Sequence, residues 1–148
     1  MRSISLIASA FLVMAFEPPG TSGQTPNTAV QVAVAPFTAE HDSAGVVRAA
    51  ADSTLERLVR TLTEKGVAVV RLKQLSEKTM HAARPARWAV LGKFKREKGT
   101  FDAELRLMDV ESGEEQVSYF NSDKDARKLP SIGEGAGARI AAYVKERK

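Results

Sequence analysis

Residues 88–121 read WAVLGKFKREKGTFDAELRLMDVESGEEQVSYFN, and this stretch decides the fold of the chain. Apolar residues alternate with polar or small ones in three segments, which predicts three strands at 88–94, 101–110 and 116–120. Lys98-Gly99 and Ser112-Gly113 separate these segments and are typical of tight turns. The stretch therefore predicts an antiparallel meander with Gly99 and Gly113 as turn residues.

The segments before the meander predict a strand, a helix and a second strand. Val30, Val32 and Val34 alternate with small residues, which favours a central strand that is buried on both faces. Residues 42–65 predict an amphipathic helix that is capped by Asp42 or Ser43 and ends at Gly66. Its apolar stripe consists of Val47, Ala51, Leu55, Leu58 and Leu62. A second strand at 67–72 completes a parallel, right-handed unit.

Two further helices complete the order of elements. Residues 74–81 favour a short helix that ends before Arg84-Pro85. Ser131 and Glu134 have the spacing of a capping box that opens a last helix. The fold class is α+β, a single domain in the order β-α-β-(short α)-β-β-β-α. Its mixed sheet ends in the antiparallel meander, and the helices pack on that sheet.

The composition is that of an ordinary globular protein. The chain has 148 residues, of which 43% are hydrophobic and 27% charged, and this length favours one domain. The net charge of +4 is a modest basic excess that favours an anionic surface without naming one. Patterns of nucleic-acid-binding modules are missing, and there is no cysteine for a disulfide or a thiolate metal site. We expect no nucleic-acid partner.

Residues 1–23 have the pattern of a secretory signal peptide. A positive start at Met1-Arg2 precedes an uncharged apolar run from Ile4 to Phe16, and small residues follow up to Gly23. This run is shorter than the ~20 residues of a transmembrane helix. Cleavage after Gly23 fits the small residues there, and cleavage nearer Ala15 is an alternative.

The expected cellular location follows from this signal. We expect residues 24–28 to form a flexible lead-in and residues 29–148 to form the single domain. Once the signal is removed we expect no transmembrane segment, and a periplasmic or secreted protein. No lipid-modified terminus is expected, because no cysteine follows the apolar run.

Catalytic, metal and cofactor signatures are missing from the sequence. His41 and His81 are far apart in sequence and lack further ligands at metal spacing. The glycine-rich segment 133–137 lacks the lysine and the preceding strand of a phosphate-binding loop, so we interpret it as close packing of the last helix against the meander. Glu114-Glu115 are interpreted as solvated turn charges. We therefore expect a protein that is not an enzyme and binds no metal or cofactor.

A cluster of basic residues is the candidate binding surface. It consists of Arg84, Arg87, Lys93, Lys95 and Arg96. One interpretation is an anion- or partner-binding patch, which would also allow peripheral contact with an anionic surface. The other is a solvated sheet face, on which Lys93 or Lys95 pairs across strands with Asp102 or Glu104.

The meander resembles the amino-terminal domain of TolB-type periplasmic proteins, and it is similar to CsgG-type and LpoB-type envelope proteins. The matching residues are Gly92, Gly99, Leu105, Leu107, Asp109, Ser112, Gly113 and Tyr119. Asp109 and Gly113 have a structural explanation, since Asp hydrogen-bonds its own turn and Gly accepts a positive φ. TolB-type proteins also carry a β-propeller, and the CsgG and LpoB types are lipoproteins. Because the matching features are missing here, we expect neither propeller functions nor pore formation.

Two functions remain as hypotheses from the sequence. The first is a non-catalytic interaction module of the bacterial cell envelope that binds an envelope protein or another copy of itself. Its sheet edge could add a partner strand, with 116–120 as the candidate edge. The alternative is a binder of an anionic small molecule, lipid head group or glycan through the basic cluster.

Overall fold

A computed structural model describes residues 30–42 and 44–147. The predicted signal peptide and lead-in therefore lie outside the described residues. The strands are β2 (Gln31–Val34), β3 (Thr38–Glu40), β4 (Ala68–Arg71), β5 (Trp88–Glu97), β6 (Thr100–Asp109) and β7 (Glu115–Asp123). The α-helices are α1 (Val46–Glu64) and α2 (Ser131–Glu146), and the 3-10 helices are η3 (Glu77–Ala83) and η4 (Ala126–Lys128).

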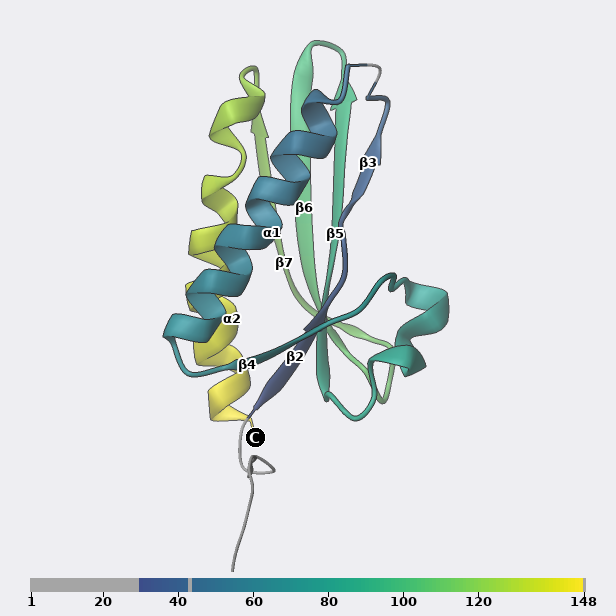
Figure 1. The fold of residues 1–148 in the computed structure, drawn as a ribbon, viewed down its shortest axis with the longest axis vertical. Coiled ribbons are helices and arrows are strands. Elements are labelled where there is room, and N and C mark those ends of the chain that lie inside the picture. Colours follow the sequence, from purple (N-terminus) through teal and green to yellow (C-terminus); the bar gives the residue numbers. More distant parts are fainter. Residues whose placement is uncertain (1–29, 43, 148) are drawn as a thin grey trace, which may run out of the picture.

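The strands form one mixed sheet in the order β4-β2-β5-β6-β7, with β3 also paired to β5 (Figure 1). Parallel pairing joins β2 to both β4 and β5, and antiparallel pairing joins β5, β6 and β7. The predicted α+β class, the parallel unit and the meander are therefore confirmed. The central position of the first strand is confirmed as well, because Val32, Ala33 and Val34 are fully buried.

One strand was missed by the sequence analysis. The chain leaves the line of β2 at Pro36 and Phe37 and then pairs again with the same strand, β5, through Thr38 and Glu40 of β3. Pro36 lacks the backbone N–H that a continuous strand would use, and this explains the interruption. The first strand therefore ends before Pro36-Phe37, as the sequence predicts, and β3 is a separate short strand.

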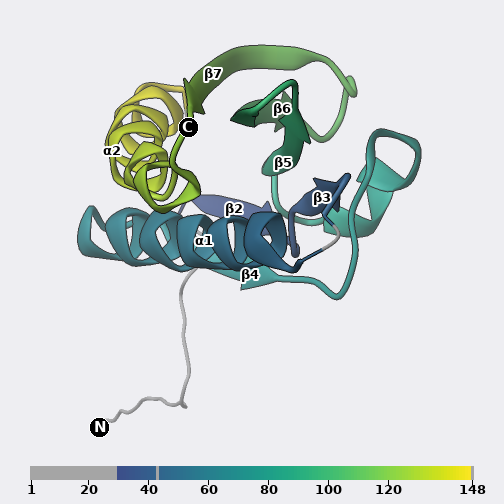
Figure 2. The ribbon, with the colours of Figure 1, turned by 90° about the horizontal axis from the view of Figure 1, so that it is seen from above.

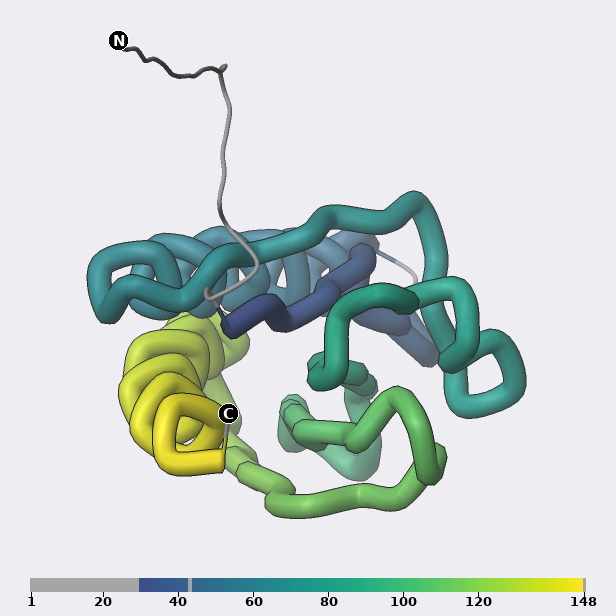
Figure 3. The backbone as a smooth tube through the Cα atoms, turned by 90° about the horizontal axis from the view of Figure 1, so that it is seen from below, coloured from purple at the N-terminus to yellow at the C-terminus, as the bar shows by residue number. Residues whose placement is uncertain are grey.

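The two α-helices lie side by side on one face of the sheet (Figures 2 and 3). The predicted apolar stripe of α1 is confirmed, because all five of its side chains are buried against the sheet or α2. The other face carries a smaller cluster, in which Met80 and Ala83 of η3 cover Ala89 and Met108. The predicted short helix is thus a 3-10 segment shifted toward Ala83. It covers only one end of that face.

The glycines of α2 let the two helices approach closely. A Cβ atom at Gly133 would lie 2.5 Å from the backbone oxygen of Thr54, and one at Gly137 would lie 2.9 Å from Cβ of Thr61. Both neighbours belong to α1, so the predicted packing of this segment against the meander is wrong. Close packing remains the reason for these two glycines, although the partner is a helix.

The predicted capping box at the start of α2 is also wrong. The helix already includes Ser131, whose hydroxyl donates to the backbone oxygen of Lys128, and Pro130 precedes it without a side-chain cap. Glu134 instead lies 3.6 Å from Arg57 and 3.8 Å from Arg60 of α1. Because Glu134 pairs with these two arginines, its side chain does not cap the start of α2. Ser131 and Glu134 therefore keep structural roles. Ser131 contacts the end of η4, and Glu134 links α2 to α1.

Neither α1 nor α2, nor any other helix within residues 30–42 and 44–147, combines the length and the apolar character of a membrane span.

Candidate functional site

The last strand of the sheet, β7, has a free outer edge in the described part of the chain. Only β6 pairs with it, along Val117 to Asp123 and again at Glu115. The predicted edge strand is therefore confirmed, and it is longer than the predicted 116–120. An edge of this kind exposes unpaired backbone N–H and C=O groups to any strand that approaches.

This edge lacks the usual protection against pairing. Soluble proteins commonly place lysine, proline or an inward-pointing charge in the middle of an edge strand. Residues 116–122 read QVSYFNS, with no charge and no proline, and they include strong strand formers. Phe120 is 67% exposed, which is more than any other large hydrophobic side chain among the described residues. The edge of β7 therefore has the composition of a strand that pairs with another strand.

A groove follows β7 where the strand passes α2. Its volume is about 360 Å³. Tyr119 and Phe120 of β7 line one side, and Ile132, Gly135 and Arg139 of α2 line the other. Burial raises the pKa of Tyr119, although the charge of Arg139 acts in the opposite direction, so its phenol stays neutral. The groove could receive side chains of a strand that pairs with β7.

The sheet face that the α-helices leave free carries alternating charges. The ladder places Lys93 next to Glu104 and Lys95 next to Asp102, as the sequence predicted for a hairpin closed at Lys98-Gly99. Glu40 of β3 is the other neighbour of Lys95. Oppositely charged residues on adjacent strands neutralise each other in part. We call this surface the open face.

Ion pairs balance further cations on the open face. The Nζ atom of Lys95 lies 3.0 Å from a carboxylate oxygen of Glu97, and the hydrogen bond and charge of Glu97 raise the pKa of Lys95. Arg106 donates to Glu77 at 2.7 Å and lies 3.7 Å from Glu115. The hydrogen bond from Arg106 lowers the pKa of Glu77, so this pair stays ionised. The charges of this face therefore largely cancel.

The five basic residues of the predicted cluster lie in three places. Lys93 and Lys95 share the open face, while Arg96 faces the opposite side with its guanidinium 5.6 Å from the ring centre of Phe101. The other two lie before the start of β5. Arg84 is 3.9 Å from Glu111, and Arg87 is 4.0 Å from Asp109 and 4.6 Å from the ring centre of Trp88. The structure thus brings together only the two lysines.

The predicted turn residues adopt the geometry that their types favour. Asp109 accepts hydrogen bonds from the backbone N–H groups of Glu111 and Ser112, at 2.9 and 3.2 Å. The φ angles of Gly66, Gly99 and Gly113 are 84°, 82° and 73°. These residues shape the ends of α1 and of the meander strands and carry no chemistry of their own.

Two features of the surface had weak signals or none in the sequence. Phe120 follows Tyr119 at the end of a short alternating segment, and a pair of aromatic residues is as typical of a core strand as of an exposed one. The pairing of β3 with β5 had no signal at all, because the three residues of β3 are too few for a periodic pattern. A proline after a short run of valines is the one signal that could have marked the break.

Comparison with solved structures shows which folds this chain shares. PelC from Paraburkholderia phytofirmans, solved as a dodecamer, matches with a TM-score of 0.52 and 22% identity over 81% of this chain and 92% of PelC. TolB from Acinetobacter baumannii matches with a TM-score of 0.51 and 16% identity over 81% of this chain and 29% of TolB. E. coli LpoB overlaps less, with a TM-score of 0.38 and 14% identity over 64% of this chain and 57% of LpoB.

Sequence comparison adds no relative, because no family model and no curated protein match the chain. The predicted resemblance to CsgG-type proteins is not tested by these structures and stays a prediction. The resemblance to TolB-type proteins is confirmed as a similarity of fold. The chain therefore has the α+β fold that PelC and part of TolB share.

Proposed function

We propose that this chain is a non-catalytic interaction module of the bacterial cell envelope, periplasmic or secreted, that pairs its β7 edge with a strand of another polypeptide. That polypeptide is a second copy of the chain or an envelope protein. The observation that carries the proposal is the unprotected edge: an uncharged middle, no proline, and Phe120 exposed beside it. Strand addition at such an edge is a common mode of protein recognition.

The comparisons and the sequence support this proposal in two ways. PelC, which shares the fold, is described as a dodecamer, so a domain of this shape is compatible with self-association. The signal-like residues 1–23 favour export. The meander also resembles the amino-terminal domain of TolB-type proteins, which are periplasmic. The proposal that the protein is not an enzyme rests on the sequence, which lacks a catalytic motif.

The substitution Phe120→Lys tests the edge. It removes an exposed aromatic ring and places a lysine where edge strands commonly carry one, so the fold should be unaffected while pairing is weakened. Losing the burial of a phenylalanine costs ~1.5–3 kcal/mol. We expect the dissociation constant for self-association or for the captured partner to rise at least tenfold, measured by light scattering and by pull-down from an envelope extract.

Val46→Lys is the matched control, because Val46 is the other exposed large hydrophobic residue among those described and lies at the start of α1, outside the sheet. This variant should associate like the unmodified protein, and circular dichroism should show both variants folded. A monomeric protein that captures no envelope protein in repeated experiments would contradict the proposal. So would a Phe120→Lys variant that associates as tightly as the control.

A further inference from the structure

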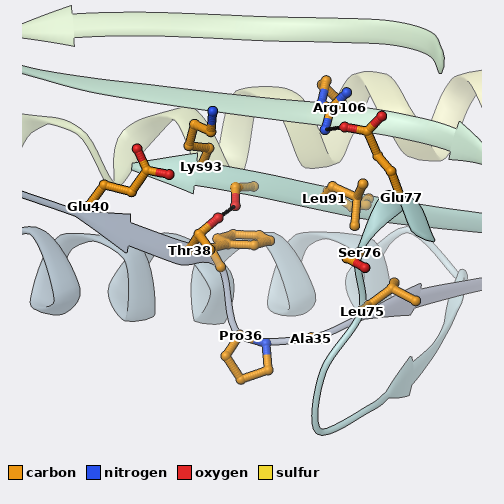
Figure 4. Close-up of a pocket in the computed structure, with 13 residues that line it drawn as sticks. Ala35, Pro36, Thr38, Glu40, Leu75, Ser76, Glu77, Leu91, Lys93 and Arg106 are labelled. Atoms are coloured by element: carbon orange, nitrogen blue, oxygen red, sulfur yellow. Dashed lines mark hydrogen bonds and ion pairs between the residues drawn. The ribbon is translucent and has the colours of Figure 1, made fainter. Parts of the chain in front are cut away.

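A cleft opens on the molecule where β2 ends, at a distance from the β7 edge (Figure 4). Its volume is about 230 Å³. Pro36, Thr38 and Glu40 form one wall, Leu75 belongs to the opposite wall, and Leu91 and Lys93 of β5 form the floor. Among the described residues β3 pairs only with β5. No strand of the described part of the chain lies on the other side of β3, in line with β4, so this position beside β3 is open.

The topology of the sheet explains why a cleft exists here. After β2 the chain continues in the sheet as β3 beside β5 and then reaches α1 on one face, whereas after the neighbouring strand β4 it turns to η3 on the other face. Segments that follow two adjacent parallel strands and diverge to opposite faces leave a crevice at the carboxyl ends of these strands. In open α/β sheets this crevice is the usual place of ligand binding. The cleft occupies this position at β2 and β4.

Most polar groups that line the cleft already have partners. Arg106 and Glu77 form the ion pair at one end, with 2.7 Å between nitrogen and oxygen. The hydroxyl of Thr38 donates to the backbone oxygen of Gly92, at 2.9 Å. Within residues 30–42 and 44–147, the ammonium of Lys93 and the carboxylate of Glu40 make no hydrogen bond and no ion pair within 4.0 Å. Each has an oppositely charged neighbour on the adjacent strand, Glu104 beside Lys93 and Lys95 beside Glu40, but, in the part that the structure describes, neither charge has a direct partner at this other end of the cleft (Figure 4).

The pair of free charges selects the class of ligand. A simple anion would be attracted by Lys93 and repelled by Glu40 and Glu77, whereas a simple cation would meet the reverse. A molecule that carries an ammonium group and a carboxylate on the same carbon atom can bind Lys93 and Glu40 together. Leu75 and Leu91 add apolar surface for a short side chain, a combination typical of small-molecule sites.

We propose that this cleft binds a small zwitterion of the amino-acid type. The ligand carboxylate accepts from the ammonium of Lys93, the ligand ammonium donates to Glu40, and its apolar side chain lies against Leu75 and Leu91. This site is independent of the pairing edge on β7, so either can fail without the other.

Titration of the purified protein with L-leucine tests the proposal, with backbone amide chemical shifts as the readout. We expect saturable shifts at Thr38, Leu91 and Lys93 and none at Ala141 of α2, which packs on the other face of the sheet. Two analogues separate the charges: 4-methylpentanoate lacks the ammonium group and 3-methylbutylamine lacks the carboxylate. Each should bind roughly tenfold more weakly or worse, because each lacks one hydrogen bond between charged groups.

Variants of the two charged residues complete the test. Lys93→Gln and Glu40→Gln should each weaken leucine binding about tenfold, by the same reasoning. The control is Lys95→Gln, on the same strand and face but paired with Glu97 and outside the cleft, and it should bind like the unmodified protein. The absence of saturable shifts, equal binding of either analogue, or equal losses in Lys93→Gln and Lys95→Gln would each overturn the proposal.

Discussion

Gly92, which lines the cleft, has no side chain, and this leaves room for the ring of Phe37. A Cβ atom there would lie 2.5 Å from the ring of Phe37, so only glycine leaves room for this ring. The ring is buried and stacks on Phe94 with 5.8 Å between the ring centres. By holding Phe37 in the core, Gly92 lets the chain leave the line of β2 at Pro36 and return as β3. Gly92, one of the residues on which the resemblance to TolB-type proteins is based, thus has a packing role here.

The glycines of α2 allow a paired prediction at the residue scale. In Gly133→Ala the new methyl group would meet the backbone of Thr54 at 2.5 Å, and overpacking of this kind costs ~1–3 kcal/mol of unfolding free energy. Gly135 faces open space, with no atom within 4 Å of a Cβ there, so Gly135→Ala should stabilise by ~1 kcal/mol through helix propensity. Urea unfolding measures both changes. Equal effects of the two substitutions would contradict the helix contact described here.

At the scale of one element, the start of α1 depends on a side chain that lies before the helix. Asp42 accepts hydrogen bonds from the backbone N–H groups of Val47 and Arg48, at 2.9 and 2.7 Å. Gly45 bridges the two parts with a left-handed φ of 75°. The carboxylate thus satisfies N–H groups that no helical carbonyl can reach, and its charge suits the positive end of the helix dipole.

This arrangement predicts an acid-sensitive contribution to stability. Desolvation raises the pKa of Asp42, but the backbone hydrogen bonds outweigh it and hold the pKa below the ordinary value of 3.8. A carboxyl group with a lowered pKa stabilises the fold above its unfolded pKa, and this stabilisation is lost as the pH falls through the folded value. Asp42→Asn should be less stable at pH 7, and the difference from the unmodified protein should shrink toward pH 2.

Thermal unfolding of both proteins between pH 2 and pH 7 measures this difference. Asp52→Asn is a suitable control, because Asp52 also lies at α1 but, among the described residues, forms its one ion pair with Arg48 on the helix surface, at 3.3 Å. An exposed pair of this kind contributes little to stability. A difference between Asp42→Asn and the unmodified protein that does not change with pH would rule out a role for the carboxylate charge.

At the scale of the whole molecule, the elements with a strong local signal were predictable. The stripe from Val47 to Leu62 and the turns at Gly99 and Gly113 depend on neighbours in sequence, and the structure matches them. β3 was missed because Thr38 to Glu40 has too few residues for a periodic pattern. It exists only through its ladder with Lys93 to Lys95, more than fifty residues away. Contacts of this range leave no trace in a local pattern.

The candidate surfaces were harder to predict, for the same reason. Lys95 and Arg96 are adjacent in sequence, but they face opposite sides of the sheet because side chains alternate along a strand. Apart from Glu97 of β5 itself, the carboxylates that balance the open face come from β3, β6, β7 and η3. The charge of a surface is therefore a property of the assembled sheet, and a basic cluster in the sequence did not become a basic surface.

The last prediction concerns the salt dependence of self-association. If two copies pair β7 with β7 in antiparallel orientation along its full length, the middle residue Tyr119 lies on the two-fold axis. Glu115 of each copy then lies opposite Asp123 of the other, and like charges in this position repel. Salt screens this repulsion, so the dissociation constant should fall as the ionic strength rises from ~0.01 to ~0.15 M.

Sedimentation velocity at several salt concentrations measures this dependence, and the expected mass is that of two copies. A variant with Glu115→Gln and Asp123→Asn removes the repulsion, so it should associate more tightly at low salt and respond less to added salt. A mass above two copies would instead indicate that the edge of β7 pairs with the unlike edge at β4, since only unlike edges let a sheet continue from copy to copy. An association that weakens with salt would place attractive charges at the contact and so argue against the pairing of two β7 edges.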